Sequence, residues 1–203
     1  KYEVTQAQYE AVMLGNDANL SATPSNSANN PNRPVEKVSW RDVQVFLARL
    51  NEKQADSLPD GWAYVLPTEA QWEYACRAVT TTAYSWGDTI SPTDANWDHG
   101  NDANQTENVG QYSANPWGFF DMHGNVWEWT ADAYASFASG AQTDPFNDIG
   151  SSRILRGGSF SNGNYQLKSS RRFNRTPSDR PTNVGFRLAL RDINKAPTDL
   201  NST

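Results

Sequence analysis

The feature that most limits how this chain can fold is the loss of helical periodicity after Thr80. From there to the C-terminus, Gly, Pro, Asn and Asp recur every few residues between short aromatic segments. These residues favour turns, so the second half should consist of loops held in place by aromatic rings. Partly alternating apolar and polar residues predict only short strands, at 126–129, 153–160 and 184–190.

Helices are predicted only before Thr80. Thr5 with Gln8 and Thr68 with Gln71 have the spacing of capping boxes, and Ser39 is a third N-cap. The helix after Ser39 carries the clearest buried stripe, formed by Val43, Phe46, Leu47 and Leu50. A short strand is expected at 62–66. Helices followed by short strands and loops predict an α+β fold.

The chain contains one cysteine, Cys76. A single cysteine excludes an internal disulfide, a two-cysteine redox centre and a thiolate zinc site within the chain. Cys76 shares one face of the third predicted helix with Trp72, Ala75 and Val79. We therefore expect it to be buried as a small hydrophobic residue.

The composition and net charge of the chain limit the kinds of partner that it can bind. The 203 residues show no compositional break, which favours one core. A net charge of −6 argues against nucleic-acid binding, and no apolar run approaches the ~20 residues of a membrane span. Nine basic residues nevertheless lie between Arg153 and Arg191, against the single acid Asp179. Most of these arginines are expected to be structural.

Seven segments occur in an order that resembles one protein family. They are YEVTQAQY, PVEKVSW, LPTEAQWEYACR, ANW, GNVWEWT, RGGSF and NVGFRLAL. Together they resemble the formylglycine-generating enzymes, also called sulfatase-modifying factors, and an ordered set is more specific than any one motif. The resemblance implies a variant of the C-type lectin fold that is low in regular secondary structure, with bound calcium and a shallow surface groove.

The resemblance also sets the expected domain limits. It implies a domain at 1–191 from which an N-terminal strand is missing. Residues 192–203 are similar to a linker towards a cadherin-like or immunoglobulin-like repeat of bacterial surface proteins. A secreted or cell-surface protein, of bacterial origin, is therefore expected.

Catalytic members of the family carry two cysteines after RGGS, and here those positions are Asn162 and Leu167. Neither residue can form a thiolate, so the family's oxidase reaction is not expected and no copper is expected. Trp127 and Ser159 retain positions that line the family's active site. These four are predicted to be vestigial site positions, with no catalytic residue among them.

The resemblance implies structural calcium, which requires oxygen ligands at flexible spacing. By resemblance to the family motif, the first site would use the carboxylate of Asp121 and the carbonyls of Gly124 and Val126. Glu128 would be an additional ligand of this site. A second site would use the Asn96 side chain and the Trp97 carbonyl, completed by Asn101 and Asp102. The alternative is that these residues only form turns.

The two histidines, His99 and His123, are too few for a three-histidine metal site, so both are expected in surface turns. A catalytic iron is not expected in this chain.

The leading hypothesis is a non-catalytic, calcium-stabilised binding domain of receptor or adhesin type, with a groove formed by residues 160–175. Its ligand would be a peptide, a glycan or another protein. The predicted contacts are Phe160, Ser161, Asn162, Asn164, Tyr165, Lys168, Arg171, Arg172 and Arg175.

Two alternatives remain open. One is an oxidoreductase of the same family, either of the formylglycine-generating type or an oxidative tailoring enzyme, that uses a non-cysteine site. The other is a structural spacer without a ligand. An acid or histidine with a shifted pKa in the groove would favour the enzyme, but residues 160–175 contain neither.

Overall fold

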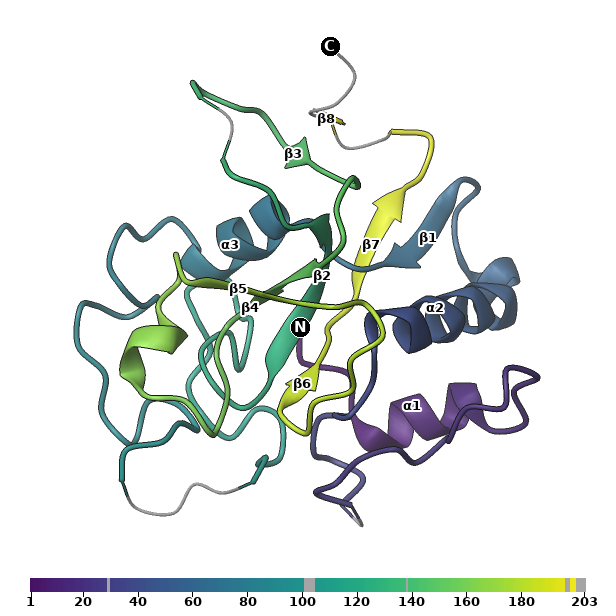
Figure 1. Ribbon diagram of the computed structural model, residues 1–203, viewed down its shortest axis with the longest axis horizontal. Helices are drawn as coiled ribbons and strands as arrows, with labels where there is room; N and C mark the ends of the chain where they lie inside the picture. Colours follow the sequence, from purple (N-terminus) through teal and green to yellow (C-terminus); the bar gives the residue numbers. More distant parts are fainter. Residues whose placement is uncertain (29, 101–104, 138, 196–197, 200–203) are drawn as a thin grey trace.

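The computed structural model describes residues 1–28, 30–100, 105–137, 139–195 and 198–199. All three α-helices end by Arg77, with one short strand between the second and the third helix, and further short strands joined by long irregular segments follow (Figure 1). The predicted α+β class is therefore confirmed. The loop residues Asn101 and Asp102 lie outside the described residues.

Each helix begins at its predicted cap. The helices are α1 (Gln6–Met13), α2 (Trp40–Gln54) and α3 (Glu69–Arg77). The side chains of Thr5, Ser39 and Thr68 each accept a hydrogen bond from the backbone N–H of the residue three positions later. The side chain of that later residue in turn accepts a hydrogen bond from the backbone N–H of the cap. These bonds satisfy donors that the helix itself leaves free. Two short 3-10 helices are also present, η1 (Ala55–Ser57) and η2 (Asn164–Leu167).

The central sheet has four strands in the spatial order β5-β4-β2-β6. They are β5 (Arg172–Arg175), β4 (Arg153–Arg156), β2 (Trp127–Ala133) and β6 (Val184–Gly185). β2 and β4 are antiparallel, as are β4 and β5, whereas β6 runs parallel to β2. Two smaller sheets pair β1 (Trp62–Val65) with β7 (Ala189–Asp192) and β3 (Pro145–Phe146) with β8 (Thr198–Asp199).

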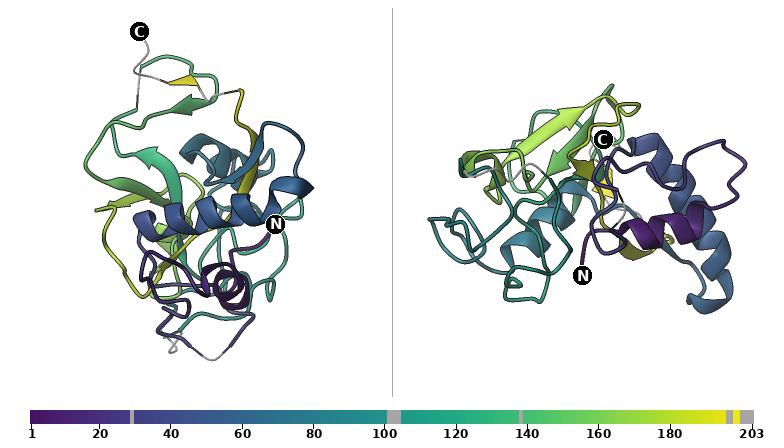
Figure 2. Two further views of the ribbon diagram at one scale, coloured as in Figure 1. Left: turned by 90° about the vertical axis from the view of Figure 1, so that its right-hand side faces the viewer. Right: turned by 90° about the horizontal axis from the view of Figure 1, so that it is seen from below.

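The main hydrophobic core lies between α1, α2 and the central sheet, where the two helices pack side by side (Figures 1 and 2). The Tyr9 and Phe46 rings stack with centroids 5.3 Å apart, and the Phe186 ring meets Phe46 edge-on at 5.2 Å. Trp129 and Leu155 close the core from the sheet side. Aromatic contacts of this kind contribute beyond their buried area.

A buried ion pair interrupts the predicted strand at 184–190. Arg187 points into the core and binds both carboxylate oxygens of Glu128, with Nε–Oε2 at 2.5 Å and Nη2–Oε1 at 2.7 Å. Nε1 of Trp72 donates to the same carboxylate at 2.8 Å. A buried guanidinium needs such partners, and β6 and β7 therefore form on either side of Arg187 as separate strands.

Other predicted boundaries also shift. The strand predicted at 153–160 ends at Arg156, because Gly157 and Gly158 take left-handed φ values of +96° and +76°. The strand predicted at 126–129 extends to Ala133. Val79 is exposed and not buried, since α3 ends at Arg77.

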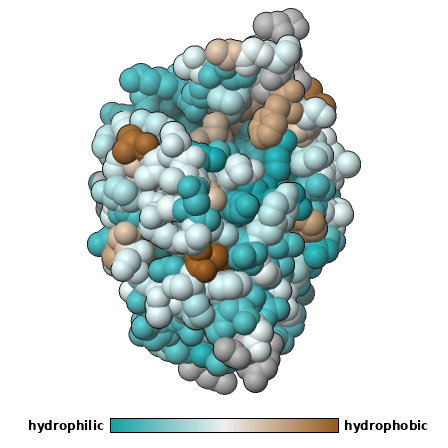
Figure 3. Space-filling model, turned by 90° about the vertical axis from the view of Figure 1, so that its left-hand side faces the viewer, coloured by the Kyte–Doolittle hydropathy of each residue, from teal (hydrophilic) through white to brown (hydrophobic). Residues whose placement is uncertain are grey.

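Between α3 and β2 the described residues contain no helix and no strand longer than a single bridge. The rings of Tyr84 and Trp86 stack at 5.5 Å, and both meet the His123 ring edge-on. Loops held by rings are thus confirmed, but the prediction of a surface turn for His123 is wrong because its side chain is buried. On the face that these loops form, hydrophobic residues are small separate spots on a mainly hydrophilic surface (Figure 3).

Candidate functional site

Three of the four vestigial site positions meet where β2 passes the turn after Gly158. Oδ1 of Asn162 accepts a 2.7 Å hydrogen bond from Nε1 of Trp127 and a 2.6 Å bond from Oγ of Ser159. Nδ2 of Asn183 then donates to the hydroxyls of Ser159 and Ser161, at 3.1 and 3.0 Å. The amide of Asn162 is therefore the acceptor at the centre of a closed polar network.

The fourth position, Leu167, lies in the core. Its side chain is fully buried in a cluster with Tyr84 and Ala95. A Cβ added to Gly158 would lie 2.8 Å from Leu167 Cδ1, so the glycine leaves room for the leucine. Asn162 and Leu167 thus serve hydrogen bonding and packing, and neither supplies a thiolate.

A pocket of about 130 Å³ adjoins the Asn162 network. Its lining residues are Trp127, Leu155, Asn162, Gln166, Arg171, Phe173, Arg175, Asn183 and Val184. Apolar side chains, amides and the guanidinium groups of Arg171 and Arg175 all contribute to this lining. This lining contains no carboxylate, histidine or cysteine, which leaves it without the usual acid-base or soft-metal groups.

The cations around this pocket have no acidic partner among the described residues. Lys168, Arg171 and Arg175 form no ion pair within 4.0 Å there. Lys168 Nζ and the Arg171 guanidinium instead flank the Tyr165 ring, at 5.3 and 4.9 Å from its centroid. Nε of Arg171 is buried without a hydrogen-bond partner. The pocket lining therefore includes two cations, Arg171 and Arg175, that have no acidic partner among the described residues.

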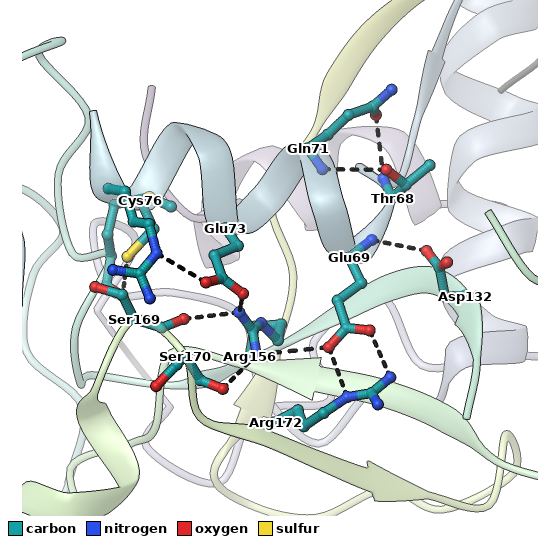
Figure 4. A network of polar contacts seen from close by, with 12 residues as sticks. Thr68, Glu69, Gln71, Glu73, Cys76, Asp132, Arg156, Ser169, Ser170 and Arg172 are labelled. Carbon is teal, nitrogen blue, oxygen red and sulfur yellow. Dashed lines mark hydrogen bonds and ion pairs between the residues drawn. The ribbon is translucent and has the colours of Figure 1, made fainter. Parts of the chain in front are cut away.

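Two residues predicted for the groove lie elsewhere. Side chains alternate along a strand, and Arg172 projects from the opposite face of β5 to Arg171. There it binds both carboxylate oxygens of Glu69, at 2.8 and 2.6 Å (Figure 4). Phe160 is buried, so its ring is not a ligand surface. Ser161, Asn164 and Tyr165 are exposed, but none of them lines the pocket.

Most of the paired arginines are structural. Arg156 is fully buried, binds Glu73 and donates to the carbonyls of Ser169 and Ser170 (Figure 4). Arg180 binds Asp42, and Arg172 and Arg187 also hold carboxylates. Of the nine basic residues in this part of the chain, four arginines thus pair with carboxylates. The other five form no ion pair among the described residues: Arg153, Lys168, Arg171, Arg175 and Arg191.

A larger hollow of about 550 Å³ lies on the other face of β5, beside α3 and Phe137. Its charged side chains Glu69, Glu73 and Arg172 are already paired with one another or with neighbouring arginines. Burial raises the pKa of Asp132 there to about 6, against the opposing bonds from the N–H groups of Glu69 and Asn147. Apart from Asp132, the charged side chains that line this hollow are thus already paired.

The predicted calcium ligands lie close together but are not all available. The N–H of Asn125 donates to the Asn96 carbonyl at 2.9 Å, which joins the two predicted sites. Asp121 is buried, and its Oδ2 accepts a bond of 2.6 Å from the N–H of Gly110. Glu128 is occupied by Arg187 and Trp72. A calcium ion would therefore rely on Asp121 and on the carbonyls of Gly124 and Val126.

The sequence reasoning missed Glu3, which is fully buried beside these residues. Its oxygens accept bonds from Asn125 Nδ2 at 2.7 Å and from the N–H of Val126 at 3.2 Å. Burial, with the nearby carboxylates of Asp121 and Glu128, raises its pKa well above the usual range. Although Glu3, Asp121 and Glu128 lie near Arg187, no three acid, histidine or cysteine side chains among the described residues form a group that could hold a metal ion. The calcium site stays a prediction.

Sequence reasoning also missed Gln166, Phe173 and Asn183 as pocket residues. The alternation Arg171-x-Phe173-x-Arg175 is a strand signal that was available, but it lies inside a segment expected to be a loop. Asn183 lies 21 residues beyond Asn162 and reaches the pocket only through the pairing of β6 with β2.

The sequence model of the Sulfatase-modifying factor enzyme 1-like domain matches residues 1–192. The chain belongs to this family. It is 34% identical over 178 residues to the formylglycine-generating enzyme of Streptomyces coelicolor, covering 78% of this chain and 53% of that protein. It is 29% identical over 172 residues to the inactive C-alpha-formylglycine-generating enzyme 2 of Bos taurus, covering 77% and 50%. The chain thus spans about half the length of these relatives.

Among solved structures, Treponema denticola variable protein 1 superposes on this sulfatase-modifying-factor-type domain with a TM-score of 0.75. That match has 28% sequence identity and covers 92% of this chain and 83% of the other. The C-type-lectin-like fold of the formylglycine-generating type is thereby confirmed. Among the described residues, no helix is both long enough and apolar enough to span a membrane.

Proposed function

We propose that this domain is a non-catalytic binding module of receptor or adhesin type, and that it holds an anionic ligand in the pocket beside Asn162. The observation that carries the proposal is that Arg171 and Arg175, which line the pocket, form no ion pair with a described acid. Such groups bind carboxylates or sulfates through charge-assisted hydrogen bonds. The Phe173 and Tyr165 rings offer rigid contact surfaces at little entropic cost.

Loss of the oxidase reaction forms part of this proposal. Asn162 and Leu167 replace the two cysteines, and the relatives include a protein described as inactive. An oxidoreductase with a non-cysteine site would need acids, histidines or a metal set around the pocket, and its described lining has none. The hypothesis of a binding module is therefore favoured over that of an oxidoreductase.

We further propose that calcium stabilises the loops around Asp121, and that the domain is secreted or displayed on a bacterial cell surface. The carboxylate of Asp121 and the carbonyls of Gly124 and Val126 are the oxygen ligands that this proposal assigns to the ion. The matches to proteins of Streptomyces and Treponema are consistent with a bacterial source.

An array of acidic peptides, acidic oligosaccharides and their neutral counterparts tests the proposal. We expect the domain to bind acidic ligands, and Arg171→Glu/Arg175→Glu to lose them. The control Lys53→Glu/Lys195→Glu changes the net charge equally at exposed positions away from the pocket lining and should bind normally. Equal binding by both variants, or no acidic ligand at all, would refute the proposal.

A further inference from the structure

The strand β5 forms one edge of the central sheet. It pairs with β4 on one side, and no other described strand pairs with it on the other. Figure 2 (right) shows this light green strand on the outside of the molecule. Alternate backbone N–H and C=O groups of an edge strand point away from the sheet. β5 therefore offers a row of backbone donors and acceptors to an added strand.

The side chains along this edge define one recognition face. Arg171, Phe173 and Arg175 alternate onto the face that carries the pocket, and all three line it. The Phe173 ring is 40% exposed, and the Arg175 guanidinium lies 5.6 Å from its centroid. Two unpaired cations thus stand four residues apart with an exposed ring between them.

Charged residues on a short edge strand often serve only to prevent pairing between sheets. That role would account for the two arginines. It does not account for the exposed ring of Phe173 beside a hollow, or for the buried, unpartnered Nε of Arg171. An incoming strand with acidic side chains would replace the repulsion by ion pairs.

We propose that the ligand is an extended acidic segment of a partner protein, which adds as a strand to the free edge of β5. In an added strand, residues two apart share a face, so acids four residues apart would reach Arg171 and Arg175. The residue midway between them would be apolar and would lie against Phe173. This inference rests on the proposed function and names the ligand class for the same pocket.

The probe is the nonapeptide Ser-Thr-Glu-Thr-Val-Thr-Glu-Thr-Ser, labelled for fluorescence polarisation. Two derivatives separate strand addition from simple charge attraction. One is N-methylated at the amides of both glutamates and the valine, and the other at the amides of the two threonines beside the valine. Because alternate amides of a strand point to opposite edges, only one derivative should lose the bonds to β5.

We expect the parent peptide to bind and one N-methylated derivative to lose affinity about tenfold or more, while the other binds as the parent does. Arg171→Glu/Arg175→Glu should abolish binding, whereas Lys53→Glu/Lys195→Glu should retain it. Equal affinity of the two derivatives, or no binding of the parent, would overturn strand addition.

An oligogalacturonate run in parallel separates the two proposals. Binding of this acidic saccharide without the peptide would refute strand addition and leave the proposed function standing. Failure of both anionic ligands would refute both.

Discussion

Nε1 of Trp127 donates a 2.7 Å hydrogen bond to Oδ1 of Asn162. The same oxygen accepts a hydrogen bond from the hydroxyl of Ser159. The amide therefore connects β2 to the loop that builds the pocket.

Because of this role, Asn162 should contribute measurably to the free energy of unfolding. Asn162→Leu should lower the free energy of unfolding by about 1–3 kcal/mol, because the indole N–H and the serine hydroxyl lose their acceptor. Chemical denaturation measures the change. The exposed Asn164→Ala should change it by less than about 0.5 kcal/mol, and an equally small effect of Asn162→Leu would contradict the assignment.

The absence of a thiol at Asn162 and Leu167 predicts no oxidase activity. With copper and a Cys-x-Pro-x-Arg peptide, the wild-type domain should form no formylglycine detectable by mass spectrometry. Asn162→Cys should also be inactive, since position 167 supplies no second soft ligand. Turnover by either protein would show that the reaction has another route through this site.

The sequence could predict the helices because capping and the apolar stripe are local. Ser39, Asp42 and Phe46 lie within eight positions of one another, and their pattern sets both the start and the buried face of α2. The predicted strand at 184–190 failed because Arg187 is drawn inward by Glu128, a residue 59 positions away. Long-range pairing of this kind leaves no local signal.

The pocket was predictable only in part, for the same reason. The family motif located Asn162, Arg171 and Arg175, and the structure brings them together. It could not show that Arg172 turns to Glu69 or that Asn183 joins the pocket, because both depend on strand pairing.

Asp132 should make stability depend on pH. Its pKa is raised in the fold to about 6 from an ordinary value of 3.8, mainly by burial. The folded state therefore holds the proton more tightly, which stabilises it at low pH and is lost as pH rises through about 6. The stability of the wild type relative to Asp132→Asn should fall by about 1–3 kcal/mol between pH 4 and pH 7. Urea unfolding at both values measures this, and a constant or growing difference would contradict it.

We expect calcium binding to raise the thermal stability of the domain. At a calcium concentration a hundredfold above Kd, the stabilisation is about 2.7 kcal/mol, which corresponds to a Tm rise of roughly 5–10 °C. Asp121→Asn should remove the rise, whereas Asp17→Asn at an exposed position should not. Differential scanning calorimetry checks both variants. No rise in the wild type, or the same rise in Asp121→Asn, would show that calcium does not use this carboxylate.

The central claim is that the pocket beside Asn162 binds an anionic ligand and carries out no chemistry on it. A crystal structure of the domain with the acidic ligand that binds best on the array tests this most directly. We predict that a ligand anion lies within hydrogen-bond distance of the Arg171 and Arg175 guanidiniums, with the ligand chemically unchanged. A ligand bound elsewhere, or a transition metal held in the pocket beside an altered ligand, would contradict it.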